Sequence, residues 1–241
     1  MTGQPHILLQ PGQVSERVIL CGDPARVTRI ASLLADAKPL ASNREFTSVN
    51  GQFQGLPITV CSTGIGAPSA IIALEELIKC GGRQFIRVGS AGALQPQIAL
   101  GDLIVAEAAV RDDGGSASYA PVAYPALANR LLVNGLSDYL QQYLQRHHLG
   151  IVRSHDSFYT DQELAICRQW HQLGVLAADM ETAALFTVGR LRDVAVASVL
   201  NNVVLYGEHA ADGINDYVAA ETIMMQGEQL AARAALAALC Q

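Results

Sequence analysis

Three arginines have side chains and neighbours suited to binding a small anion. Arg26 follows a turn that begins at Gly22, Arg44 precedes a short apolar run, and Arg87 comes just before a small-residue segment containing Ser90. The forked guanidinium group of arginine matches the oxygens of phosphate, and a glycine N–H and a serine hydroxyl can add donors. These residue types therefore favour a site for an anionic small molecule such as phosphate.

The three arginines differ in whether their neighbours in the sequence are typical of a solvent-exposed residue. Arg26 and Arg44, each taken alone, are more typical of a solvated surface. Arg87 lies between Ile86 and Val88 in an apolar run, where a cation is costly unless an anion or an acid meets it. Arg87 is therefore the stronger candidate for the anion site.

Acidic and aromatic residues supply a second set of candidates. The segment Asp179-Met180-Glu181 lies where an apolar run gives way to a helical pattern, and a carboxylate there can bind two vicinal hydroxyl groups, as on ribose. The alternative is an ordinary acid favoured by the helix dipole. Phe158 and Tyr159, in a polar turn, can stack on a planar base or simply cover the edge of the core.

Motifs of several other enzyme classes are missing from the sequence. There is no GxxxxGK[ST] phosphate loop, no HExxH zinc motif and no GxSxG nucleophile elbow. The six histidines lack the spacing of metal ligands, and Gly64-Ile65-Gly66 lacks the third glycine of a dinucleotide fingerprint. These absences argue against a nucleoside triphosphate hydrolase, a histidine-rich metal site and a serine hydrolase.

Composition and charge exclude some partners. The net charge of -6 and the isoelectric point near 5.4 argue against binding to nucleic acid. No stretch approaches the roughly 18 apolar residues of a membrane span, and the first residues lack the pattern of a signal peptide. The five cysteines are widely spaced and typical of reduced thiols, so we expect a cytoplasmic protein without disulfides.

The segment 58–94 predicts the unit that positions the anion site. Two apolar strands, Ile58–Cys61 and Phe85–Val88, flank a helical pattern. Small-residue turns are expected after both strands, at Ser62–Gly66 and Gly89–Gly92. Ligands bind at the carboxyl ends of strands in open α/β sheets, where such turns expose N–H groups.

Strands and helices alternate along the rest of the chain. Further strands are expected at Arg17–Cys21, Arg44–Val49, Gly101–Ala106, Ile151–Arg153, Val175–Ala178 and Val194–Leu200. Helices are expected after Pro24, at Ala126–Arg146, at Asp161–Gln172, at Met180–Leu191 and from about Asn215, with a turn at Asn50-Gly51. The alternation predicts a single α/β domain spanning residues 1–241, with a central mixed β-sheet flanked by helices in three layers.

The motifs together resemble those of a known enzyme family. Residues 62–69, STGIGAPS, followed by Glu76-Leu77, look like the signature of the uridine phosphorylase and hexameric purine nucleoside phosphorylase family. Further family-like motifs occur in the same order and spacing, at residues 22–26, 44–46, 87–93 and 179–181. The resemblance runs from Pro5 to the C-terminal helix, and residues 110–114 and 158–159 look nearest to the uridine phosphorylase branch.

The resemblance implies a role for each matching residue. Phosphate would be bound by Gly22, Arg26, Arg87 and Ser90, with Arg44 reaching in from a neighbouring subunit. Ribose would be bound by Met180 and Glu181, with His6 of the neighbour near the 5′-hydroxyl, and the base would meet Phe158 and Gln162. Positions that bind a monovalent cation such as potassium between subunits match Glu45, Ile65 and Ser69. The residues placed nearest to the chemistry are Arg87, Glu181 and Asn202.

The implied function is that of a nucleoside phosphorylase of the uridine phosphorylase type. Inorganic phosphate, as co-substrate, would attack C1′ of a nucleoside and release the free base and (deoxy)ribose 1-phosphate, without an organic cofactor. The expected assembly is a homohexamer, a trimer of dimers, whose active sites are shared between subunits. Positive charge grows on the ribose as the glycosidic bond breaks, so positioning and electrostatics would supply most of the catalysis.

Departures from the family pattern concern the base. Uridine phosphorylases bind uracil with a glutamine and an arginine two residues later, but here Leu164 follows Gln162 at that spacing, and Val203 replaces a second arginine. Asn202 stands where purine-specific members have an aspartate that protonates the base, and it cannot act as that acid. Asp179 replaces the usual glutamate. The alternatives are a phosphorylase of 6-oxopurine nucleosides, a phosphate-independent nucleosidase and a catalytically weak nucleoside-binding homologue.

Overall fold

A computed structural model describes residues 3–143, 146–209 and 223–241 of the chain. Its sheet contains ten strands in the order β10-β6-β8-β9-β5-β1-β4-β3-β2, with β7 paired to β6. The strands are β1 (Arg17–Cys21), β2 (Ala35–Asn43), β3 (Phe46–Phe53), β4 (Leu56–Ser62), β5 (Gln84–Ala93), β6 (Leu103–Asp112), β7 (Ala126–Leu127), β8 (His147–His155), β9 (Ala177–Asp179) and β10 (Ala195–Val204).

The sheet is mixed and partly closed. β1 pairs in parallel with β4 and β5, whereas β9 pairs antiparallel with β5. β10 pairs with β5 as well as with β6, so five of the strands form a closed ring. β5 belongs to this ring and also to the open part of the sheet, so it joins the two parts.

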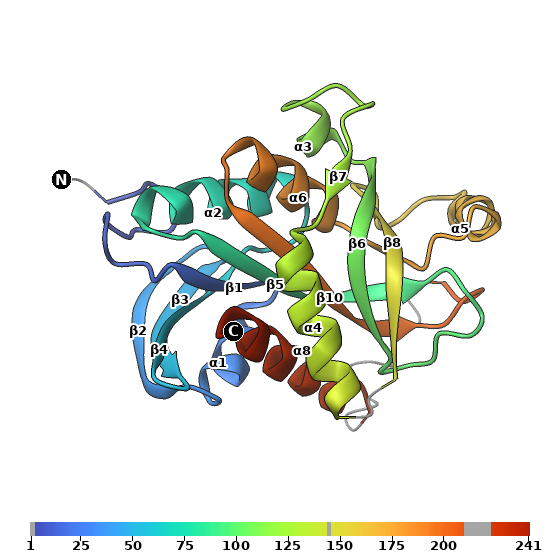
Figure 1. The fold of residues 1–241 in the computed structure, drawn as a ribbon. Coiled ribbons are helices and arrows are strands. Elements are labelled where there is room, and N and C mark those ends of the chain that lie inside the picture. The colour runs from blue at the N-terminus through green and yellow to red at the C-terminus, as the bar shows by residue number, and fades with distance from the viewer. Residues whose placement is uncertain (1–2, 144–145, 210–222) are drawn as a thin grey trace.

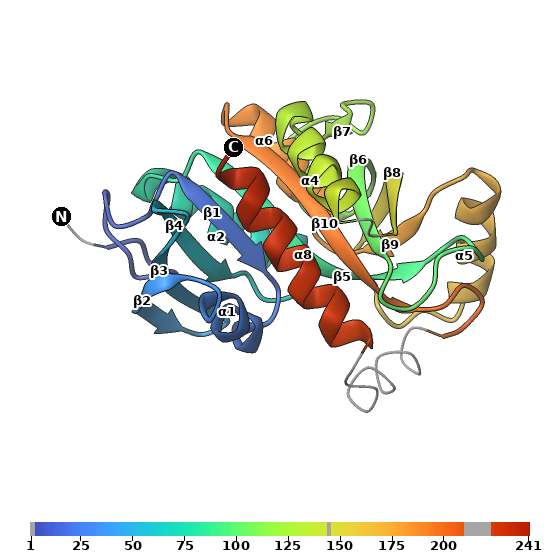
Figure 2. The ribbon, with the colours of Figure 1, turned by 60° about the horizontal axis from the view of Figure 1, so that its bottom comes forward.

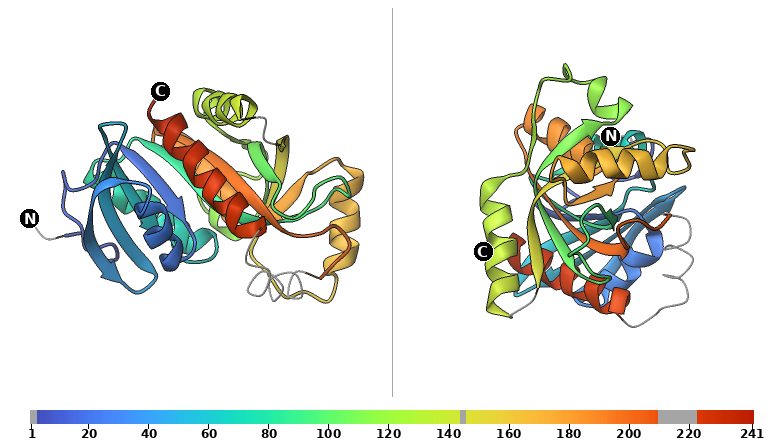
Figure 3. Two further views of the ribbon diagram at one scale, coloured as in Figure 1. Left: turned by 90° about the horizontal axis from the view of Figure 1, so that it is seen from below. Right: turned by 90° about the vertical axis from the view of Figure 1, so that its right-hand side faces the viewer.

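Helices cover both faces of the sheet. They are α1 (Pro24–Ala31), α2 (Ala67–Cys80), α3 (Gly114–Ala117), α4 (Arg130–Gln142), α5 (Glu163–Gln172), α6 (Thr182–Leu191) and α8 (Ile223–Leu239). α2 and α6 lie together on one side, and α1 and α8 lie on the other (Figure 1). α8 runs beside β10 and β5 (Figure 2), and α5 lies at the end of the molecule opposite β2 and β3 (Figure 3). The predicted α/β class with a mixed sheet between helices is confirmed.

The helix ends follow from local sequence. The Asp23 side chain accepts a hydrogen bond from the Ala25 N–H at 2.8 Å and caps α1, with Pro24 in the first turn, where its missing N–H is no loss. Gly66 precedes α2 with φ of 91°, a conformation that favours glycine. These caps fix the loops that follow β1 and β4, next to the expected anion site.

Two expected turns are wrong, because both segments lie inside strands. Gly89–Gly92 belongs to β5, which pairs with β10 and β9 and so continues to Ala93. Asn50-Gly51 lies within β3, where glycine allows close packing, since a Cβ at Gly51 would come within 2.8 Å of the Leu34 Cβ. The strand expected at Arg44–Val49 begins two residues later in the structure. Arg44 and Glu45 form the turn after β2, and β3 begins at Phe46.

Several helix boundaries also differ from expectation. The segment expected as one helix at Ala126–Arg146 forms β7 and then α4, because Asn129 caps the N–H groups of Leu131 and Leu132. α5 begins at Glu163 without a side-chain cap, so Asp161 does not cap it. α6 begins at Thr182, which leaves Met180 and Glu181 in the connection before it. The helix start expected near Asn215 lies outside the described residues.

Candidate active site

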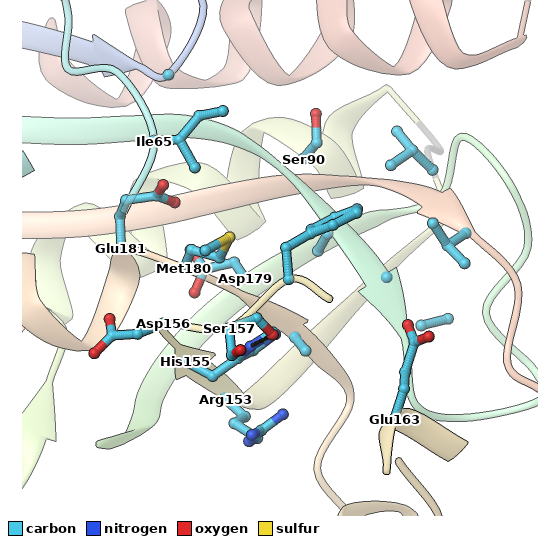
Figure 4. Close-up of a pocket in the computed structure, with 18 of the residues that line it drawn as sticks. Ile65, Ser90, Arg153, His155, Asp156, Ser157, Glu163, Asp179, Met180 and Glu181 are labelled. Carbon is cyan, nitrogen blue, oxygen red and sulfur yellow. Dashed lines mark hydrogen bonds between the residues drawn. The ribbon is translucent and has the colours of Figure 1, made fainter. Parts of the chain in front are cut away.

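A cavity of about 1010 Å³ lies at the carboxyl ends of β1, β5 and β9, and α5 forms its far wall. It brings together most of the residues singled out from the sequence, namely Gly22, Arg26, Glu45, Ile65, Ser69, Arg87, Ser90, Phe158, Met180 and Glu181. Figure 4 shows Ile65 and Ser90 on one side of this cavity and Arg153 and His155 on the opposite side, with Met180 and Glu181 between them. The topology thus gathers segments that are far apart in sequence.

Four of the expected site residues lie away from this cavity. Arg44 is exposed in the turn between β2 and β3, with φ of 54°. His6 lines a separate surface hollow beside α2, and Gln162 is exposed just before α5. Asn202 is fully buried in β10, where its Nδ2 donates to the Ala99 carbonyl at 3.0 Å.

Arg87 lies on β5 with its guanidinium group between two acids. Its Nε donates to Asp179 Oδ2 at 3.1 Å, and its Nη2 lies 2.5 Å from Glu181 Oε2. The Arg87 side chain folds over Gly89, where a Cβ would come within 2.7 Å of the guanidinium carbon. The segment 179–181 therefore provides the acids that a buried arginine requires. Glycine is needed at position 89 because the Arg87 side chain occupies the space of a Cβ.

The two acids have different surroundings. Asp179 also accepts hydrogen bonds from Ser154 Oγ at 2.5 Å and Thr182 Oγ1 at 2.6 Å, so its two oxygens are used inside the protein. Glu181 accepts the Gly66 N–H at 2.6 Å and borders the cavity. Burial raises the pKa of Glu181, while the charge of Arg87 acts in the opposite direction. Glu181 is thus the carboxylate that a ligand in the cavity can reach.

Arg26 lies beside Ser90 and is held in place by the last helix. Its Nη2 donates to Ser90 Oγ at 2.9 Å and its Nη1 to the Val88 carbonyl at 3.1 Å. Its Nε donates to Glu228 Oε2 at 2.7 Å, and Glu228 also binds Arg29 through Nε at 2.5 Å. Glu228 was not expected from the sequence, because an acid in a C-terminal helix carries no signal of its own.

We expect Glu228→Gln to lower the free energy of unfolding by about 1.5–3 kcal/mol at pH 7, the typical contribution of hydrogen bonds to charged groups. Burial raises the pKa of Glu228, but hydrogen bonding by Arg29 and the charge of Arg26 outweigh it and hold the pKa below its usual value. The stabilisation is therefore present above the unfolded pKa and is lost as pH falls through the folded pKa. Urea unfolding at several pH values should show the difference between variant and wild type shrinking in acid.

The exposed Glu107 offers a matched control for this experiment. Glu107→Gln should change the free energy of unfolding by less than about 0.5 kcal/mol, as surface substitutions usually do. A Glu228→Gln difference that stayed constant from pH 7 to pH 3 would contradict the ion-pair interpretation.

The three residues matched to a cation site lie together at the cavity edge. Ser69 Oγ donates to Glu45 Oε1 at 2.8 Å and to the Thr63 carbonyl at 2.5 Å. Ile65 is 78% exposed in the loop before α2. Within the described part of the chain, no group of three or more His, Cys, Asp or Glu side chains is placed to hold a metal ion.

The end of the cavity near α5 contains residues that the sequence did not single out. Arg153 and His155, two residues apart on β8, both border it, and so does Glu163 of α5. Burial and the charge of Arg153 lower the pKa of His155. Val203 borders the cavity, whereas Leu164 does not. From the sequence, the only signal for placing Arg153 and His155 on one face was their spacing of two residues, beginning in a predicted strand, because side chains alternate between the faces of a sheet.

Comparison with known proteins decides the family. Residues 16–239 match the sequence model of the family described as "Phosphorylase superfamily". The chain belongs to the phosphorylase superfamily. Among curated members it is 42% identical over 200 residues to a uridine phosphorylase of Thermococcus kodakarensis, covering 78% of this chain and 72% of that protein. It is 39% identical over 215 residues to a guanosine phosphorylase of Halorubrum lacusprofundi, covering 88% and 89%.

Solved structures of phosphorylase superfamily members agree in fold. A uridine phosphorylase of Vibrio fischeri ES114 is 55% identical, with a TM-score of 0.94 and coverage of 100% of this chain and 98% of that chain. Toxoplasma gondii purine nucleoside phosphorylase, in complex with immucillin-H, is 30% identical with a TM-score of 0.89, covering 99% and 96%. The expected family, fold and enzyme class, a pentosyltransferase of the nucleoside phosphorylase type, are confirmed, and phosphate is the co-substrate of this family.

None of the helices in the described ranges has the length and hydropathy needed to span a bilayer.

Proposed function

We propose that the chain cleaves uracil nucleosides with inorganic phosphate, and that the cavity bordered by Arg87 is its active site. One observation carries the proposal: a single cavity is bordered by Arg26 and Ser90, which are hydrogen-bonded, by Arg87 and Glu181, which are ion-paired, and by Phe158. These groups fit, in order, a phosphate, a ribose and a planar base. The identity of the Vibrio fischeri relative, a uridine phosphorylase, supports uracil as the base.

Phosphate would bind against Arg26, Arg87, Ser90 and the N–H of Gly22. Arg26 is fixed by Glu228, and the hydrogen bond between Arg26 and Ser90 gives the site a defined shape before phosphate arrives. Preorganised donors stabilise charge without reorganising during the reaction. The phosphate dianion then has a fixed position from which to attack C1′.

Glu181 would bind the 2′- and 3′-hydroxyls of the ribose, beside Met180. As the bond from C1′ to the base nitrogen breaks, its electron pair leaves with the base and the ribose gains positive charge. The new bond forms between C1′ and a phosphate oxygen on the opposite face. Glu181 and the phosphate both place negative charge next to the ribose, which favours this transition state. Asn202 would have no direct part in this step, since it does not border the cavity.

We further propose that the site is completed by a neighbouring subunit in a homohexamer. Arg44 is exposed and absent from the cavity of its own chain, which fits a role in another subunit. His6 is held at the surface by Glu76, whose Oε1 lies 2.7 Å from His6 Nδ1 and whose Oε2 accepts the His6 N–H at 3.1 Å. A histidine fixed in this way is suited to reach a neighbour's 5′-hydroxyl.

The remaining parts of the proposal concern the cation, the base site and the compartment. The proximity of Glu45, Ser69 and the Thr63 carbonyl supports a potassium site between subunits. Phe158 borders the cavity and would stack on the base, whereas Gln162, which is exposed, would need to turn inwards to contact it. All five cysteines are free, which supports a cytoplasmic protein. The single sheet, to which all ten strands belong, supports one domain.

A 6-oxopurine nucleoside is the second candidate substrate, and the guanosine phosphorylase of Halorubrum lacusprofundi is the observation that favours it. The position of Asn202 speaks against it. Asn202 is buried, directs Nδ2 to the Ala99 carbonyl and lies outside the cavity, so it offers no proton to a purine.

Side-by-side assays test this proposal. Uridine, thymidine, inosine and adenosine should be incubated with and without phosphate, and the free base measured. We expect phosphate-dependent release, fastest with uridine. Equal release without phosphate would indicate a nucleosidase. No turnover of any substrate would indicate a nucleoside-binding homologue, and faster release from inosine would indicate a purine enzyme.

A further inference from the structure

The base end of the cavity lacks the arginine that uridine phosphorylases place two residues after their glutamine. Leu164 occupies that position and does not border the cavity, and Val203, which does, is apolar. A base with carbonyl oxygens needs hydrogen-bond donors, because carbonyl oxygens buried without partners are costly. The cavity must therefore supply a donor from another element.

Arg153 of β8 is the only arginine other than Arg26 and Arg87 that borders the cavity among the residues that the structure describes. It is in register with Ala178 of β9, and Ala178 is in register with Gly92 of β5. Residues in register share one face of a sheet, and two strand spacings separate Arg153 from Gly92, about 10 Å. In the structure the guanidinium group is directed to Asp112 of β6, on the side of β8 away from β9. Asp112 also borders the cavity, so a ring that extends past Ala178 can meet the guanidinium group there.

The guanidinium group of Arg153 is anchored on one side only. Its Nε and Nη2 both bind the same oxygen, Asp112 Oδ2, at 2.8 and 2.6 Å. Its carbon lies 5.9 Å from the ring centre of Trp170 on α5. Within the described ranges, no hydrogen-bond partner exists for Nη1. The Arg153 residue as a whole is 7% exposed, so a mostly buried side chain keeps one unused donor at the cavity.

The charge of Arg153 affects the pKa values of two side chains that border the cavity. It contributes to lowering the pKa of His155, after burial, and it partly offsets the rise that burial causes in the pKa of Cys167. Both side chains border the same end of the cavity, one from β8 and one from α5. Figure 4 shows Arg153 on the side of the cavity opposite Ser90, which is where a base would lie if phosphate binds near Ser90.

We propose that Arg153 reads the base, by donating a hydrogen bond from Nη1 to a carbonyl oxygen of the leaving pyrimidine. This inference rests on the proposed function. As the glycosidic bond breaks, the electron pair on the base nitrogen spreads onto the ring carbonyls, and a charged donor strengthens as that negative charge grows. Arginine only donates, so an oxo group is preferred to an amino group at the contacted position, and uracil is preferred to cytosine.

Arg153→Lys is the most direct test, because it keeps the charge and the partner Asp112 while removing the forked group. We expect kcat/KM for uridine to fall roughly 10–100-fold, the effect of losing a hydrogen bond to a charged group, while KM for phosphate changes less than about twofold. The dissociation constant of uracil, measured by titration calorimetry with inorganic phosphate present, a pair that cannot react, should rise by a similar factor. A plain structural role would move neither the uracil affinity nor the ratio of the two KM values.

Arg192 offers a matched control outside the cavity. It also pairs with a carboxylate, Glu75, at 2.7 Å, and it also lies over an aromatic ring, Tyr119, at 5.7 Å. Arg192→Lys should leave kcat/KM for uridine and uracil affinity within about twofold of wild type.

A second variant is needed if the Arg153→Lys protein folds poorly because lysine is too short to reach Asp112. The double variant Asp112→Asn with Arg153→Met removes both charges of the ion pair. We expect its melting temperature to be close to that of wild type, while its uracil affinity stays as low as in Arg153→Lys. Unchanged uracil affinity in either folded variant would overturn the inference. Failure of the proposed function appears differently, as a wild-type protein that releases no base with phosphate, and uracil titration would still report on Arg153 in that case.

Discussion

Arg87→Ala is expected to reduce phosphorolysis by at least about 10³-fold, at the upper end of the effect of removing one preorganised donor to a transition state. Arg87 would contact the phosphate, and it also holds Glu181 through the 2.5 Å contact between Nη2 and Oε2. Its loss therefore removes a phosphate ligand and releases the proposed ribose ligand together. Initial rates at saturating uridine over a wide range of phosphate concentration measure the effect.

The same variant should be less stable. Asp179 and Glu181 are 4% exposed, and without Arg87 both carboxylates are buried without a cation. Removing one partner of a buried pair costs about 3–5 kcal/mol, which urea unfolding would detect. The control is Arg83→Ala, just before the same strand, where the side chain is exposed and binds only backbone carbonyls. Normal phosphorolysis by a folded Arg87→Ala protein would remove Arg87 from the proposed site.

Glu181→Gln is expected to lower kcat for uridine by about 10²–10³-fold. Glutamine can still accept the Gly66 N–H, so the loop before α2 should stay in place. It lacks the negative charge that would bind two hydroxyls and stabilise positive charge on the ribose. Melting temperatures should show that the variant is folded, because Arg87 keeps Asp179 as a partner.

The substrate itself provides the control for Glu181. With 2′,3′-dideoxyuridine, which has no hydroxyls for Glu181 to bind, the ratio of wild-type to variant rates should be much smaller than with uridine. An equal loss on both substrates would mean that Glu181 acts by holding Arg87 rather than by binding ribose.

Arg87 and the segment 179–181 could be singled out from the sequence because their immediate neighbours are unusual. Arg87 is a cation within an apolar run, and the segment 179–181 is an acidic boundary between a strand pattern and a helix pattern. A cation inside an apolar run needs an acid, and the structure supplies Asp179 and Glu181. The α/β class also followed from local alternation of strand and helix patterns. These features depend on neighbours in the chain, which a sequence displays directly.

Other features depend on contacts between distant residues. Glycines at 51 and 89 looked like turn residues, but both lie in strands where a neighbouring side chain, Leu34 or Arg87, needs their space. Arg153 and Glu228 gave no signal, since their importance comes from Asp112, 41 residues away, and Arg26, 202 residues away. Only the folded arrangement of the strands and α8 shows these pairs.

The contact between Arg26 and Glu228 has a consequence for synthesis of the chain. Chains leave the ribosome N-terminus first, so early segments of a domain are made before its last helix. Arg26 and Ser90 belong to the first half, but the acid that orients Arg26 belongs to α8, the last helix. A nascent chain therefore holds the proposed phosphate pocket in an unfinished form, and the pocket gains its final shape only after translation has passed residue 228.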